Sequence, residues 1–154
     1  MNNPRLLNRI DKAWEAFLDS MEGLSEEEML KPGVSGDWSV RDIIAHVTSW
    51  EEEALKALPL ILAEKRLPRY SDLYGGINAF NDLMTEKNRL LPLEEVIRKR
   101  DETHQRLRDY VGKTETDKGS IQTRFRRRLG FDSHRHYHEH TEAILAWRGK
   151  KWKT

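Results

Sequence analysis

Apolar residues recur every three or four positions through each long segment of the chain, and this spacing limits the possible folds. Between Pro4 and Gly23 they fall at Leu6, Leu7, Ile10, Ala13, Trp14, Phe17, Leu18 and Met21. A helix brings such positions to one face, whereas a half-buried strand needs strict alternation. The pattern predicts a helix that begins after the cap residue Asn3 and ends near Gly23.

The same spacing predicts three further long helices, at residues 39–59, 93–111 and 132–148. Pro59 should end or kink the first of these, because proline lacks a backbone donor. The alternative is that residues 60–64 continue it as another turn. Shorter helical segments are expected at 25–30 and 77–90, and a polar loop is expected at 112–130. The chain should therefore fold as an all-α four-helix bundle, in one domain that covers residues 1–154.

The charge balance and the lack of cysteine exclude several classes of function. The chain has 27 Lys and Arg residues against 26 Asp and Glu, so we expect no overall attraction to nucleic acid or to an anionic membrane. It has no cysteine, which excludes disulfides, thiolate nucleophiles and zinc–thiolate sites and fits a reducing compartment. No apolar signal segment or membrane span is recognisable, so we expect a cytoplasmic protein.

Histidines alternate with other residues through the last predicted helix, at His134, His136, His138 and His140. Residues four apart lie one above the other on a helix, so the four form two pairs. The stripe through His136 and His140 continues into apolar residues, at Ala143, Ile144 and Trp147, whereas the other stripe is mixed. His136 and His140 are thus predicted to face inward, where two imidazoles could chelate a divalent ion. The alternative is a set of surface histidines.

A third histidine, His46, falls at the edge of the apolar face of the 39–59 helix, between Ile43 and Trp50. Asp42, one turn earlier, could orient the imidazole as a hydrogen-bond acceptor behind a metal ligand. The alternative is a histidine at the boundary of the core that is hydrogen-bonded to a neighbouring carboxylate.

Other candidate residues are less sharply indicated. Glu53 falls toward the side of the helix that carries His46, and Trp50 and Tyr137 could wall a pocket. The alternative for Trp50 is simple packing in the core. His104 is surrounded in sequence by charged residues and is expected to face solvent. The basic run from Arg124 to Arg128 could grip a phosphate or an acidic ligand, although a solvated loop is the expectation we favour.

Three segments resemble the DinB-like superfamily. Residues 36–46, Gly-Asp-Trp-Ser-Val-Arg-Asp-Ile-Ile-Ala-His, followed by Trp50 and Glu51, are similar to the start of the family's second helix. Residues 136–140, His-Tyr-His-Glu-His, followed by Ile144 and Trp147, are similar to its last helix. Residues 77–90, with Asn78, Phe80 and Asn81, resemble the branch often called ClbS/DfsB-like.

The resemblance implies a four-helix bundle with up-down-down-up connectivity, often dimeric. Many members hold a divalent metal on three histidines, whose positions match His46, His136 and His140. Known roles in the family include thiol-dependent transferases, a maleylpyruvate isomerase and a resistance protein that disarms a genotoxin. We therefore predict that the three histidines bind zinc or nickel, since imidazole suits both ions, and that the protein is a homodimer.

Three neutral imidazoles leave a divalent ion its full charge and at least one open position. Such a site suits hydrolysis, or activation of a low-molecular-weight thiol, which would be a cosubstrate because the chain has no cysteine. Our first hypothesis is a metal-dependent transferase or hydrolase that acts on a small reactive molecule, in detoxification or stress resistance. The second is a non-enzymatic bundle that binds a small ligand and uses its histidines structurally. Nucleic-acid binding through the basic run is the third.

Overall fold

A computed structural model describes residues 4–116 and 119–151, and this part of the chain forms eight α-helices. Their bounds are α1 (Pro4–Ser20), α2 (Glu26–Leu30), α3 (Val40–Leu62), α4 (Tyr70–Leu73), α5 (Ile77–Asn88), α6 (Leu93–Lys113), α7 (Ser120–Asp132) and α8 (His134–Lys151). Within the described residues there is no β-strand, only an isolated bridge between Ser35 and Trp38. The all-α fold predicted from the apolar spacing is confirmed, while the expected cap Asn3 lies outside the described residues.

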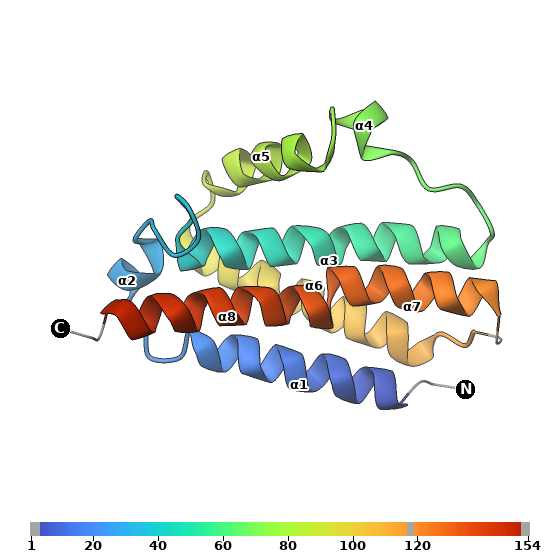
Figure 1. Cartoon of the computed structure of the whole chain (residues 1–154), viewed down its shortest axis with the longest axis horizontal. Helices are drawn as coiled ribbons and strands as arrows, with labels where there is room; N and C mark the ends of the chain where they lie inside the picture. The colour runs from blue at the N-terminus through green and yellow to red at the C-terminus, as the bar shows by residue number, and fades with distance from the viewer. Residues whose placement is uncertain (1–3, 117–118, 152–154) are drawn as a thin grey trace.

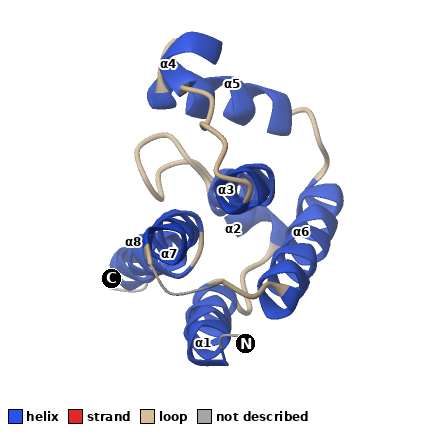
Figure 2. Ribbon diagram, turned by 90° about the vertical axis from the view of Figure 1, so that its right-hand side faces the viewer, coloured by secondary structure: helices blue, strands red, loops and turns tan. Residues whose placement is uncertain are grey.

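Four helical columns make the bundle (Figures 1 and 2). α1, α3 and α6 are three of the columns, and α7 continues nearly in line into α8 to form the fourth. α1 and the α7–α8 column run one way and α3 and α6 run the other way, which is the up-down-down-up order. α3 packs against α6 and α7, and α1 packs against α8.

The connection between α3 and α6 is long because these neighbouring helices are parallel, and a short loop joins only antiparallel neighbours. The connection contains α4 and α5, which lie outside the bundle beside α3 (Figure 2). No helix in the described part of the chain has the length and apolar character needed to cross a membrane.

The start of α3 is fixed by a reciprocal cap. The Ser39 hydroxyl accepts a hydrogen bond from the backbone N–H of Asp42, and the Asp42 carboxylate accepts one from the backbone N–H of Ser39, both at 3.1 Å. Pro59 does not end the helix, because α3 continues to Leu62, as the alternative of a further turn predicts. Leu58 and Ile61, on either side of the proline, are almost fully buried, so packing holds the last turn in place.

The predicted loop at 112–130 is also wrong, because residues 120–130 lie in α7. Phe125 and Leu129 lie one turn apart on this helix and are at most 1% exposed. Their burial anchors α7 against α3, while several arginines cover its outer face. The last helix is longer than expected as well, since α8 runs through Gly149 to Lys151.

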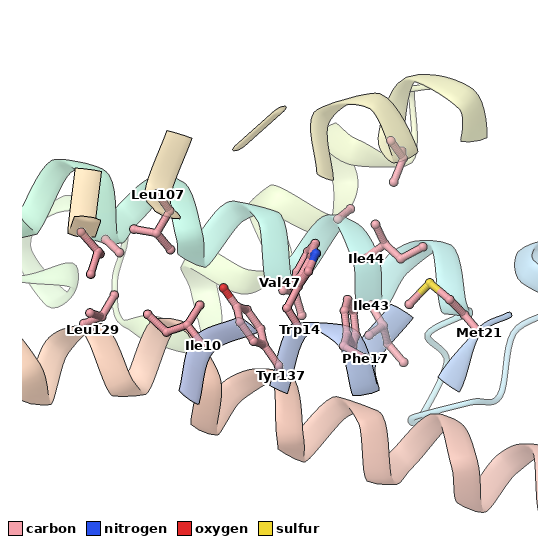
Figure 3. Close-up of a cluster of buried hydrophobic side chains, with 14 of the residues drawn as sticks. Ile10, Trp14, Phe17, Met21, Ile43, Ile44, Val47, Leu107, Leu129 and Tyr137 are labelled. Carbon is pink, nitrogen blue, oxygen red and sulfur yellow. The ribbon is translucent and has the colours of Figure 1, made fainter. Parts of the chain in front are cut away.

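The core lies between the four columns, and every column contributes to it (Figure 3). Its members include Ile10, Trp14 and Phe17 of α1, Ile43, Ile44 and Val47 of α3, Leu107 of α6, Leu129 of α7 and Tyr137 of α8. Each large apolar side chain buried in this way stabilises the fold by about 1.5–3 kcal/mol. The core therefore fixes the rotation of α3 and α8, on which the candidate site depends.

Candidate metal centre

The three histidines singled out in the sequence meet between α3 and α8. The Nε2 atom of His136 lies 3.0 Å from Nε2 of His46 and 3.0 Å from Nε2 of His140. The rings are steeply inclined to one another, with interplanar angles of 71°, 78° and 79°. Each ring offers one nitrogen, and the three nitrogens lie within 4.8 Å of one another.

Burial elsewhere on the same helices brings these rings together. On α8, the side chains of Tyr137 and Ile144 are fully buried in the core. With those two residues fixed inward, His136 and His140 project from the adjoining face, one turn apart and toward α3. His138 is exposed. His134 is half-buried, and burial, followed by the charges of Arg9 and Arg135, lowers its pKa.

The clustered histidines are neutral at pH 7. Burial lowers the pKa of His46 to about 2, and repulsion from the other two rings contributes to the shift. Burial, together with the charge of His140, lowers the pKa of His136 to about 3. Burial also lowers the pKa of His140. Protonation of any ring would place a positive charge in a poorly solvated site beside the other two rings, so each ring keeps a free lone pair.

Hydrogen bonding among the rings cannot account for this geometry. Nε2 of His136 carries either one hydrogen or one lone pair, so it makes one good hydrogen bond, yet it has two nitrogen neighbours at 3.0 Å. A cation shared by the rings would satisfy all three nitrogens together. Two nitrogens that each lie about 2.0–2.1 Å from one metal ion are roughly 3.0–3.4 Å apart, which agrees with the observed spacing. The donor set therefore fits a divalent ion.

The expected role of Asp42 behind His46 is wrong. Its carboxylate caps α3 and accepts two hydrogen bonds from the Arg89 guanidinium, at 3.2 and 3.1 Å. Burial opposes ionisation, but the hydrogen bonds from Arg89 and Ser39 lower the pKa of Asp42. Among the described residues, none accepts a hydrogen bond from the buried Nδ1 of His136.

The other expected neighbours of the site also point elsewhere. Glu53 accepts a hydrogen bond from the Tyr70 hydroxyl at 2.9 Å and faces α4. Trp50 donates to Asn81 at 2.8 Å and packs on Phe80. Both residues bind the α4–α5 connection to α3 and do not wall a metal pocket.

Trp38 takes the place expected for Trp50. Its ring centroid lies 4.5 Å from that of His46 and 6.5 Å from that of His140. Trp38 is half-buried and is held in the loop before α3, where its carbonyl accepts a hydrogen bond from Val34 at 2.9 Å. The sequence could have indicated Trp38 as a neighbour of the site, because it lies next to the cap Ser39 in the segment that carries His46.

The expectation that His104 faces solvent is wrong. Its Nδ1 atom lies 2.8 Å from a carboxylate oxygen of the fully buried Glu51, and its ring stacks on Trp14 at a centroid distance of 3.7 Å. The Tyr137 hydroxyl donates to the same oxygen at 2.6 Å. Burial raises the pKa of Glu51. Tyr137, whose ring lies among the core side chains in Figure 3, thus belongs to a polar network inside the core and not to the wall of the candidate metal site.

Comparison with known proteins bears on the identity of this bundle. The family model of the DinB superfamily matches residues 9–145, a range that contains all three clustered histidines. No curated protein and no solved structure matches the chain. With a match over most of its length and an all-α bundle as its structure, the chain belongs to the DinB superfamily.

Proposed function

We propose that His46, His136 and His140 bind one divalent ion, zinc or nickel, and that this ion serves a transferase or hydrolase acting on a small reactive molecule. One observation carries the proposal: three neutral imidazoles converge with two Nε2–Nε2 distances of 3.0 Å that hydrogen bonds cannot satisfy. Bringing together and desolvating three lone pairs costs stability, and a bound cation offsets that cost.

A divalent ion held there would supply a Lewis acid that lowers the pKa of water or of a thiol. The histidines of this chain supply neutral ligands, so they leave the charge of the ion undiminished. Trp38 covers His46 and His140 on one side and limits the access of water. The chain has no cysteine, so a thiol nucleophile must come from a low-molecular-weight cosubstrate.

Finer assignments are part of the same proposal. The ClbS/DfsB-like branch is supported by Phe80 and Asn81, which contact Trp50 from α5. A homodimer is supported by apolar side chains that α4 and α5 leave exposed, with Leu73 60% exposed and Ile77 55% exposed. A cytoplasmic location is supported by the absence of cysteine.

The proposed chemistry is tested by assaying metal-free, zinc-loaded and nickel-loaded protein. Transfer would be followed with glutathione and 1-chloro-2,4-dinitrobenzene, and hydrolysis with p-nitrophenyl acetate. We expect a metal-dependent rate in one of these two assays. The rate should be lost in His46→Ala and retained in His138→Ala, the control at an exposed histidine. Stoichiometric metal uptake without any metal-dependent rate would refute the enzymatic proposal and favour a ligand-binding bundle.

A further inference from the structure

A large cleft lies on another face of the molecule, between α1 and the junction of α7 with α8. Its volume is about 910 Å³. Among the described residues, its lining includes five arginines and no carboxylate: Arg5, Arg9, Arg126, Arg127 and Arg135. None of the three clustered histidines lines it. His134 does, and it lies two residues before His136, or roughly 200° around α8, so the cleft and the histidine cluster face different sides.

The arginines reach the cleft from three helices. Arg5 and Arg9 lie one turn apart on α1, Arg126 and Arg127 lie on α7, and Arg135 lies in the first turn of α8. All five are exposed.

The basic run singled out in the sequence is divided by the fold. Arg128 points away from the cleft, where it pairs with Asp132 at 2.7 Å and donates to the Tyr70 hydroxyl at 2.9 Å. Arg126 and Arg127 line the cleft, and Arg124, although exposed, does not.

The cleft concentrates positive charge in a chain whose overall balance is near zero. Since five of the 27 basic residues line it, acidic residues outnumber basic ones in the rest of the chain. Like charges gathered in one concave site repel one another and attract anions, and a ligand with several negative charges relieves that repulsion most. Arginine also binds phosphate oxygens in a bidentate manner.

The size of the cleft and one aromatic side chain narrow the class of ligand. The volume falls within the range of roughly 300–1,000 Å³ that is typical of small-molecule sites. Phe131 lines the cleft, is 60% exposed, and has the Arg135 guanidinium 5.7 Å from its ring centroid. An exposed phenyl ring beside cations offers a stacking surface to a planar heterocycle.

From these observations we propose that the cleft binds a small polyphosphate, with the arginines holding the phosphate chain and Phe131 stacking on the base of a nucleoside triphosphate. The site is separate from the histidine cluster and does not depend on the function proposed for it.

Isothermal titration calorimetry with ATP and inorganic triphosphate tests this proposal on wild-type protein, on the double variant Arg9→Glu/Arg127→Glu and on Arg124→Glu. Arg124→Glu is the matched control, because it reverses an exposed charge of the same basic run outside the cleft. We expect both ligands to bind the wild type, with affinity that falls as salt rises. The double variant should bind at least about tenfold more weakly, and the control should stay within about twofold of the wild type.

ATP should bind more tightly than inorganic triphosphate, and Phe131→Ala should remove the difference. Equal affinities in the wild type would overturn the stacking role of Phe131. No binding of either ligand, equal weakening by Arg124→Glu, or binding of a single-stranded oligonucleotide alone would overturn the small-molecule site. Circular dichroism of each variant establishes that its helices are retained.

Discussion

Replacing His104 by alanine should lower the free energy of unfolding by about 2–5 kcal/mol, because it removes a hydrogen-bond partner and a stacked ring from the core. The structure places this cost at Glu51, which is 0% exposed and accepts hydrogen bonds from His104 and Tyr137 on one oxygen. The other oxygen, Oε1, has no partner among the described residues. Without His104, the Tyr137 hydroxyl would be the one hydrogen-bond donor left to the Glu51 carboxyl group among the described residues.

Separate contributions give the same magnitude. Leaving a buried polar group without its partner costs about 1–3 kcal/mol, and parallel stacking of the His104 ring on Trp14 contributes about 0.5–1.5 kcal/mol. The vacated volume adds to the loss.

Urea unfolding followed by circular dichroism at pH 7 measures these differences, with chelator present so that metal binding does not contribute. His138→Ala is the matched control, since His138 is exposed and its loss should change stability by less than about 0.5 kcal/mol. A loss below about 1 kcal/mol for His104→Ala would show that the buried network is wrong and that His104 faces solvent.

Three further predictions concern the histidine cluster and the assembly of the chain. In chelator-treated protein, the free energy of unfolding should fall as pH drops from 6.5 toward 4. Burial lowers the pKa values of His46 and His136 to about 2 and about 3, so the unfolded chain takes up protons that the folded one does not. The urea midpoint should depend less steeply on pH when all three clustered histidines are replaced by glutamine, and an unchanged pH dependence would contradict the burial of the rings. Nickel should quench tryptophan fluorescence, and Trp38→Phe should remove most of the quenching, because the Trp38 ring centroid lies 4.5 Å from that of His46; full quenching in the variant would place the ion elsewhere. Light scattering at micromolar concentration should give the mass of a dimer, and a monomer mass would refute the proposed assembly.

Local sequence patterns were sufficient where one helix buries one apolar stripe. The spacing of apolar residues located α1, α3, α6 and α8, because each presents such a stripe to the core. It missed α7, whose fully buried apolar residues, Phe125 and Leu129, stand among arginines, so the segment had the composition of a solvated loop. The missed signal was the spacing of four between these two residues.

Long-range contacts could not be predicted in this way. His104 has charged sequence neighbours, and its partner Glu51 lies 53 residues away in the sequence. In contrast, His136 and His140 are four apart on one helix, so their pairing was local and predictable. His46 was proposed from its place beside the apolar face and from the family resemblance. Asp42 was assigned wrongly behind His46, because its hydrogen bonds go to Ser39 and Arg89.

Metal titration by calorimetry tests the central claim most directly, using protein purified without an affinity tag and stripped with chelator. Zinc or nickel should bind the wild type with a stoichiometry of one per chain, and His46→Ala, His136→Ala and His140→Ala should each weaken binding strongly while the helical fold survives. The controls His134→Ala and His138→Ala should bind as the wild type does, because neither residue belongs to the cluster. A wild type that takes up no stoichiometric ion, or binding that depends on His134 and His138 but not on His136 and His140, would contradict the account.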